Sequence, residues 1–172
     1  GIDNNFVLEK KSTINKKPVI GFVARLDAQK NHDNFLKSLK YINLPVDFFL
    51  IGRNVKAINL SEYNVDKINV TLLDEASDIF FYYDKFDFLI LPSIYGEAFP
   101  NVLIEAMMAG CTPVSTSCDT GPKEILSSGK YGYLVPVNNP DAMCTGLLKA
   151  INNPISKKIL NEVVSSFQEK NV

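Results

Sequence analysis

Residues 88–116 read FLILPSIYGEAFPNVLIEAMMAGCTPVST, and this stretch decides the fold. Its first four residues are all apolar, which is typical of a strand buried on both faces of a sheet. Pro100 suits the first turn of the helix that is expected to follow, near residues 101–109. A further strand is expected at 112–116. The order strand, helix, strand predicts a crossover unit of a parallel sheet.

The same alternation continues in both directions along the chain. Strands are expected at 18–24, 46–51, 68–73, 88–91, 112–116 and 133–135, and helices near 31–42, 77–86, 101–109 and 141–152. This pattern predicts an α/β fold, a Rossmann-like parallel sheet of about six strands with helices on both faces. Ligands of such sheets bind beyond the carboxyl ends of the strands, so the loops that follow the strands form the candidate site.

The chain divides into three segments. Residues 1–17 are polar and rich in lysine, and they are predicted to be an interdomain linker or lead-in. Residues 18–152 carry the strands and helices of one domain. Residues 153–172 are predicted to be a C-terminal amphipathic helix, which either covers this domain or bridges to another; its apolar positions are Ile155, Ile159, Leu160, Val163, Val164 and Phe167.

Length, charge and cysteine content exclude several classes of protein. The 172 residues suit one compact domain, and the net charge of -1 without a basic stripe argues against a nucleic-acid partner. Three cysteines without CxxC spacing favour a reducing compartment over a disulfide framework or a zinc site. Neither a signal peptide nor an apolar run of the ~20 residues that a membrane helix needs is visible. These features predict a cytoplasmic protein.

Two carboxylates frame the loop after residue 91. Glu97 lies in the loop, and Glu105 lies about one turn into the next helix, on the same side as Asn101. The free amides at the start of that helix form an anion site. Carboxylates beside an anion site suit a ligand that also carries hydroxyls, because a carboxylate can accept hydrogen bonds from two adjacent hydroxyls.

Two cations follow the first predicted strand. Arg25 offers a planar fork for phosphate oxygens, and Lys30 offers a compact point charge. Alone, Arg25 would more often form a surface salt bridge of little energy. Its position at the carboxyl end of a strand, with Lys30 close behind, favours binding of a diphosphate.

These residues resemble a known family. The Glu97-x7-Glu105 spacing in EAFPNVLIEA is similar to the E-x7-E signature of family-4 glycosyltransferases with the GT-B fold. Other stretches fit the same family in the same order, namely GID at 1–3 with Phe6, GFVARL and KN at 21–31, AGCTPV at 109–114 and GPKEIL at 121–126. The match spans about residues 1–152 and identifies the chain as the C-terminal, donor-binding half of a retaining glycosyltransferase.

The resemblance implies a role for each matching position. Arg25 and Lys30 would bind the donor's diphosphate and stabilise the charge on the departing nucleotide, while Glu97 would face the donor sugar; these three are the expected catalytic residues. Glu105 would hold the ribose hydroxyls. Gly21, in the first motif, is also an implied donor-binding position. Leu72 and Leu73 would lie against the nucleotide base. The amides around Phe99, Pro100, Asn101 and Val102 would bind the phosphate and the donor sugar. No metal or other cofactor is implied, since cations and amides stabilise the leaving group.

Two departures from the family pattern concern the donor. Ala98 and Pro100 stand where many members have glycine, which implies a narrower sugar subsite. Residues 71–73 lack the glycine often found there, so the identity of the nucleotide base that they contact stays open. The GPKEIL form is found in members that use UDP-sugars for surface glycans, and it favours UDP.

The resemblance implies transfer of a sugar from a nucleotide diphosphosugar, UDP-sugar first, to a glycan or lipid-linked acceptor with retention. The family binds its acceptor through a first domain, so this domain alone would transfer little. The full-length protein would associate peripherally with the inner face of the membrane, and the C-terminal helix could bridge to that first domain. The alternatives are a GT-B-fold epimerase or phosphorylase, and a non-catalytic nucleotide-sugar-binding module.

Several other residues are given structural roles. His32, the single histidine, is predicted to be solvated in the first turn of a helix rather than to act as a base. Cys111 and Cys118 are expected to be small core or loop residues. The aromatic run at 80–83, with Phe86 and Phe88, is predicted to pack in the core. For Glu124, a charge at a helix start and a role in the donor site stay equally open.

Overall fold

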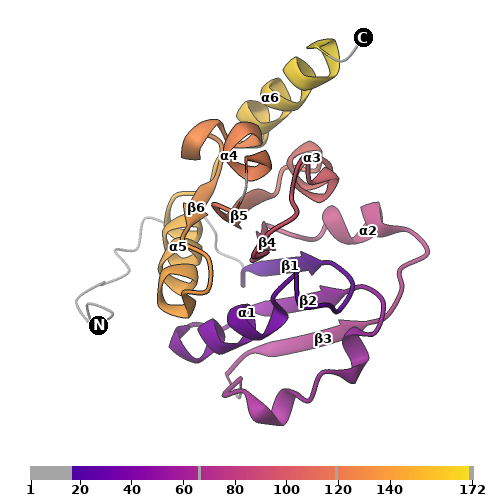
Figure 1. The fold of residues 1–172 in the computed structure, drawn as a ribbon, viewed down its shortest axis with the longest axis vertical. Coiled ribbons are helices and arrows are strands. Elements are labelled where there is room, and N and C mark those ends of the chain that lie inside the picture. Colours follow the sequence, from indigo (N-terminus) through magenta and orange to yellow (C-terminus); the bar gives the residue numbers. More distant parts are fainter. Residues whose placement is uncertain (1–16, 66, 119, 171–172) are drawn as a thin grey trace.

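A computed structural model describes residues 17–65, 67–118 and 120–170. Within them six parallel strands form one sheet in the order β3-β2-β1-β4-β5-β6 (Figure 1). The strands are β1 (Val19–Val23), β2 (Asp47–Ile51), β3 (Asn69–Leu73), β4 (Phe88–Leu91), β5 (Thr112–Thr116) and β6 (Tyr133–Val135). The order reverses between β1 and β4, which is the switch point where Rossmann-like sheets bind ligands. The predicted fold class is confirmed.

Helices cover both faces of the sheet (Figure 1). On one side lie α1 (His32–Ser38) and α5 (Pro140–Asn152), which contact each other. On the other lie α2 (Ile79–Tyr83), α3 (Asn101–Met108), α4 (Gly121–Ile125) and α6 (Lys157–Lys170). Short 3-10 turns occupy Leu39–Tyr41, Val55–Ala57, Leu60–Glu62 and Ser127–Gly129.

The central strands are fixed by burial on both sides. Every residue of β4 is buried, with Phe88 and Ile90 in the cluster under α1 and α5, and Leu89 and Leu91 in the cluster under α3 and α6. Burying one such side chain contributes about 1.5–3 kcal/mol. The continuous apolar run of β4 therefore anchors the start of the loop that carries Glu97.

Helix α6 packs against α3. Leu160, Val163 and Val164 are buried in the same cluster as Leu103 and Met107 of α3. Within the described residues the helix begins at Lys157, later than the predicted start at residue 153. The predicted lead-in at 1–17, with the GID motif, lies outside the described residues except for Lys17, which pairs with Asp47 at 2.7 Å.

Helix α2 is shorter than the predicted 77–86, and part of its aromatic run is not in the core. Asp78 caps the start of the helix by accepting a hydrogen bond from the amide of Phe80. Tyr83 is buried, but Phe80 and Phe81 are 48% and 53% exposed. The prediction that the whole run packs inside was wrong, because a helix with five residues turns only one side toward the sheet.

Candidate functional site

The loop between β1 and α1 meets the loop between β4 and α3 at the switch point. The amide of Ile94 donates to the carbonyl of Gln29 at 2.9 Å, and the Gln29 side chain donates to the carbonyl of Tyr95 at 3.0 Å. Gly96 follows with a φ of +77°, and the Gln29 amide group occupies the space where a Cβ of residue 96 would lie. The two loops that carry the predicted cations and acids are thus joined.

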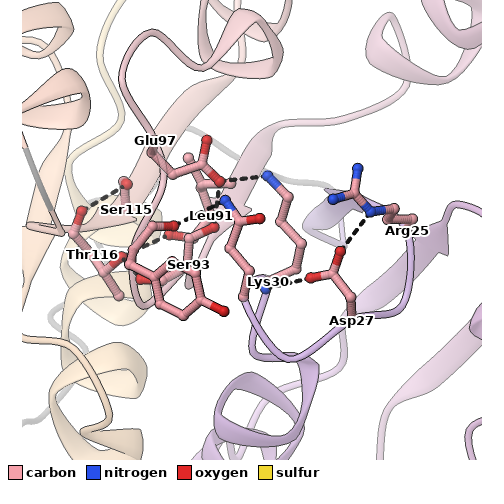
Figure 2. A network of polar contacts seen from close by, with 10 residues as sticks. Arg25, Asp27, Lys30, Leu91, Ser93, Glu97, Ser115 and Thr116 are labelled. Carbon is pink, nitrogen blue, oxygen red and sulfur yellow. Dashed lines mark hydrogen bonds and ion pairs between the residues drawn. The ribbon is translucent and has the colours of Figure 1, made fainter.

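Lys30 and Glu97 form an ion pair across these loops. The lysine Nζ lies 2.5 Å from Oε1 of Glu97, and the side chains are only 17% and 6% exposed. The hydroxyl of Ser93 donates to the same carboxylate oxygen at 2.6 Å (Figure 2). Two predicted catalytic residues, 67 positions apart in the sequence, therefore meet at the edge of the sheet.

Neighbouring elements hold Glu97 in place from behind. The hydroxyl of Thr116, at the end of β5, donates to the carbonyl of Ser93 at 2.5 Å (Figure 2). A Cβ added at Gly121, the first residue of α4, would lie 2.0 Å from the carbonyl oxygen of Glu97. Because backbone leaves no room there, only glycine lets α4 approach the loop so closely.

Arg25 is placed differently from Lys30. Its side chain is 55% exposed, and its Nε lies 2.5 Å from Oδ2 of Asp27 (Figure 2). The other oxygen of Asp27 accepts the backbone amide of Lys30 at 3.1 Å. Burial raises the pKa of Asp27, but the hydrogen bonds from Lys30 and Arg25 outweigh it and lower that pKa overall. The acid stays charged and organises both cationic residues.

Glu105 is bound by a neighbour that the sequence did not indicate. The hydroxyl of Tyr83, from α2, donates to Oε2 of Glu105 at 2.9 Å. Burial, and then this hydrogen bond, raise the pKa of the Tyr83 hydroxyl.

The residues at the start of α3, 99–102, differ in how far they are exposed to solvent. Phe99 is 44% exposed, Pro100 is the buried N-cap residue, and Asn101 is exposed. Val102 packs against the core. Proline has no backbone N–H, so Phe99, Asn101 and Val102 are the predicted amide positions that can donate.

Gly21 and the two leucines occupy positions in the sheet. Gly21 is the third residue of β1, and the ring of Phe86 fills the space beside it. The structure gives Gly21 a packing role, while its predicted donor contact stays a prediction. Leu72 and Leu73 end β3 on opposite faces, each packed against one of the two core clusters.

The prediction that His32 is solvated was wrong. The ring is 4% exposed and stacks on Phe22 with a centroid distance of 4.3 Å. Among the described residues neither ring nitrogen has a hydrogen-bond partner that meets normal geometry. Burial lowers the pKa of His32 to about 4, although the nearby Ala24 carbonyl favours the protonated form. The sheet packs on the side of the first helical turn that carries His32, which local sequence does not reveal.

The residues that sequence reasoning missed are supporting partners. Ser93 lies within the quoted LPS segment and Asp27 lies two positions after Arg25, so polar residues in the loops could have suggested them. Nothing local indicates Gln29 or Tyr83, because their contacts cross between separate elements. Cys111 and Cys118 are buried, as expected for small core or loop residues.

A hollow of about 520 Å³ lies elsewhere, between α4 and α6. Phe99 belongs to its lining, together with Ile125, Tyr131 and Phe167. The rings of Phe99 and Phe167 are 6.2 Å apart and meet edge to face. Lys30, Glu97 and Glu105 do not line this hollow.

The described residues hold neither a cluster of metal-ligating side chains nor a membrane-spanning helix. No three His, Cys, Asp or Glu side chains come together there in a group that could hold a metal ion. In that same part of the chain, no helix combines the length and apolar character needed to cross a membrane.

The sequence and the fold both match known glycosyltransferases. A 4-alpha-N-acetylgalactosaminyltransferase of Campylobacter jejuni, which acts on N-acetylgalactosamine-N,N'-diacetylbacillosaminyl-diphospho-undecaprenol, is 30% identical over 73% of this chain and 35% of its own length. The apo form of the lipopolysaccharide outer core galactosyltransferase WaaB superimposes with a TM-score of 0.75 at 20% identity, covering 91% of this chain and 46% of that one. Anabaena HepE in complex with UDP and glucose gives 0.63 at 18% identity, covering 90% and 48%.

The chain spans less than half the length of these three proteins. Its sheet has the arrangement of one Rossmann-like half of a GT-B glycosyltransferase. The model of the family described as glycosyl transferases group 1 matches residues 4–165. The chain therefore belongs to the glycosyl transferases group 1 family.

Proposed function

We propose that this chain is the donor-binding half of a retaining hexosyltransferase that uses a UDP-sugar. The ion pair between Lys30 and Glu97 carries the proposal. It joins a cation and an acid at the carboxyl edge of the sheet, in the crevice where ligands of this fold bind. A surface pair formed by chance would not be buried to 17% and 6% exposure or supported by Ser93.

The two cations have distinct roles toward the diphosphate. Lys30 has three donors on its ammonium group, and Glu97 uses one of them. Arg25 is exposed and can exchange Asp27 for phosphate oxygens in a planar, bidentate arrangement. Donors at the start of α3, from Phe99, Asn101 and Val102, add to the anion site. The base lies toward Leu72 and Leu73 at the end of β3.

The chemistry that these groups support is departure of the nucleotide. Cleavage of the anomeric C–O bond leaves negative charge on the diphosphate, and cations placed in advance stabilise that charge more than the ground state. Glu97 is held by an ammonium group and a hydroxyl, which lowers its nucleophilicity. Its role is to orient the donor sugar rather than to form a covalent intermediate. Retention at the anomeric carbon is part of the proposal.

The names of relatives support the class of acceptor and the nucleotide. The Campylobacter relative transfers N-acetylgalactosamine to a sugar linked to diphospho-undecaprenol, and the HepE structure contains UDP and glucose. We propose that the full-length protein likewise elongates a glycan or a lipid-linked acceptor at the cytoplasmic face of a membrane, where it binds peripherally. The acceptor is held by the other half of the protein, so this chain alone transfers little.

Titration calorimetry of this chain with UDP and with GDP tests the proposal. We expect UDP to bind more tightly than GDP, and equally in EDTA, because protein cations neutralise the diphosphate. Lys149 is an exposed lysine on α5 and serves as the control. The variant Lys149→Ala should bind the nucleotides like the wild type. The absence of binding to both nucleotides would falsify the proposal.

A further inference from the structure

Tyr83 is a fully buried side chain whose hydroxyl contacts Glu105, one of the predicted donor-binding residues. It is 1% exposed, and its hydroxyl donates to Oε2 of Glu105 at 2.9 Å. Tyr83 belongs to α2, which follows β3, whereas Glu105 belongs to α3, which follows β4. The hydrogen bond therefore crosses between two helices on the same face of the sheet.

The ring of Tyr83 is held on several sides. Phe80 and Phe86 meet it edge to face, with centroid distances of 5.6 and 6.1 Å. Its backbone carbonyl accepts the thiol of Cys111, in the turn before β5, at 3.3 Å. These contacts leave the hydroxyl little freedom to move. The position of its oxygen is fixed by the core and not by solvent.

A buried hydroxyl without a partner is unfavourable because nothing replaces its lost contact with water, so the bond to Glu105 is maintained. Burial raises the pKa of Tyr83 and the nearby carboxylate raises it further, which keeps the hydroxyl a donor at neutral pH. Within the described residues, the Oε1 atom of Glu105 has no hydrogen-bond donor. The carboxylate is thus anchored through one oxygen and presents the other.

We propose that Tyr83 is a positioning residue that orients Glu105 to accept hydrogen bonds from the ribose hydroxyls of the donor. The inference rests on the proposed function, in which Glu105 holds the ribose. It assigns the ability to distinguish ribose from deoxyribose to a core residue of α2 that does not touch the ligand. Such a role concerns binding of the nucleotide and not the departure of the sugar.

Comparison of UDP with 2',3'-dideoxy-UDP tests this role in the chain by calorimetry. The wild type should prefer UDP. In Tyr83→Phe, affinity for UDP should fall roughly five- to tenfold, which corresponds to about 1–1.4 kcal/mol, while affinity for the dideoxy nucleotide stays constant. A purely structural role would weaken both nucleotides equally. In the Glu105→Ala background, which removes the acceptor, Tyr83→Phe should cost no further affinity.

Tyr133→Phe is the matched control, because it removes a hydroxyl that donates to the Asn153 carbonyl at 2.6 Å, beyond the site. It should leave both affinities unchanged. If Tyr83→Phe folds poorly, Tyr83→Met fills the space with a flexible apolar side chain and must show the same hydroxyl-specific loss. An equal loss for both nucleotides, or no loss, overturns the inference alone. Failure of the wild type to bind either nucleotide overturns the proposed function together with it.

Discussion

The two ion pairs at the edge of the sheet have the same length and different surroundings. Lys30 with Glu97 and Arg25 with Asp27 each meet at 2.5 Å. The first pair is nearly enclosed, whereas the Arg25 and Asp27 side chains are 55% and 28% exposed. Removing one partner of a buried pair leaves an uncompensated charge in a medium of low dielectric constant. An exposed pair loses little, because water replaces the lost partner.

The difference separates a structural element of the site from an exchangeable one. The buried pair joins two loops through side chains of the protein itself. The exposed pair holds Arg25 near the site but stabilises it little, so a diphosphate can replace Asp27 as its partner at a small cost in free energy. The comparison predicts that the two cations differ in their effect on stability and share an effect on affinity.

The largest effect is expected for Lys30→Ala, which leaves Glu97 buried without its cation. We expect a loss of about 3 kcal/mol in the free energy of unfolding, measured by urea denaturation. Lys37→Ala is the control, since its pair with Asp33 is 57% and 55% exposed; it should lose less than about 1 kcal/mol. The double variant Lys30→Met with Glu97→Leu should recover much of the loss. Equal destabilisation by Lys30→Ala and Lys37→Ala would contradict the comparison.

The burial of His32, close to Lys30, also predicts that stability depends on pH. The pKa of His32 is about 4 in the folded chain, below its ordinary value of 6.5. The unfolded chain therefore binds a proton that the native chain excludes, and stability falls as the pH drops from about 6.5 to 4. The loss in the free energy of unfolding approaches roughly 3 kcal/mol at about pH 4. Asp27 and Lys30 are the charged groups that act on the ring, with opposite signs.

The variant His32→Phe tests this window. It keeps an aromatic ring stacked on Phe22 and removes the titrating group. Urea denaturation at pH 7, 5.5 and 4.5 should show stability falling in the wild type and much less in the variant. The lowered pKa values of Asp27, Asp33 and Asp47 act below their ordinary value of 3.8, outside this range. Parallel curves for the two proteins would contradict burial of a neutral His32.

The smallest effect on stability is expected for Arg25→Ala. Loss of an exposed pair should cost at most about 1 kcal/mol in urea denaturation. Affinity for UDP should nevertheless fall about tenfold, since a charge-assisted bond to phosphate is lost. If the affinity for UDP stays at the wild-type level, Arg25 does not bind the diphosphate and forms only a surface ion pair.

The same substitution in the full-length protein separates an enzyme from a binding module. Arg25→Ala and Glu97→Gln should each reduce transfer from a UDP-sugar strongly, because they act on the leaving group and on the donor sugar. Wild-type transfer in both variants would support the non-catalytic module. Rapid epimer formation without an acceptor would instead support an epimerase.

Local sequence was sufficient for the strands and for the loops of interest. The runs at 88–91, 112–116 and 133–135 coincide with β4, β5 and β6. Helix limits were less accurate at α2, where apolar spacing suggested a longer element than the capped helix. Periodicity reports which residues face the sheet, but it does not report where a cap ends the helix.

The sequence by itself determined the α/β fold, the family, and the loops that carry Arg25, Lys30, Glu97 and Glu105, because apolar periodicity and motif spacing are properties of neighbouring residues. The tertiary structure decided which of those residues are paired. Lys30 meets Glu97 across 67 positions, and Tyr83 meets Glu105 across 22. Packing of β1 beside β4, and of α2 beside α3, created both contacts, while packing of α1 on β1 buried His32. Such proximity is set by the order of strands in the sheet rather than by any local pattern.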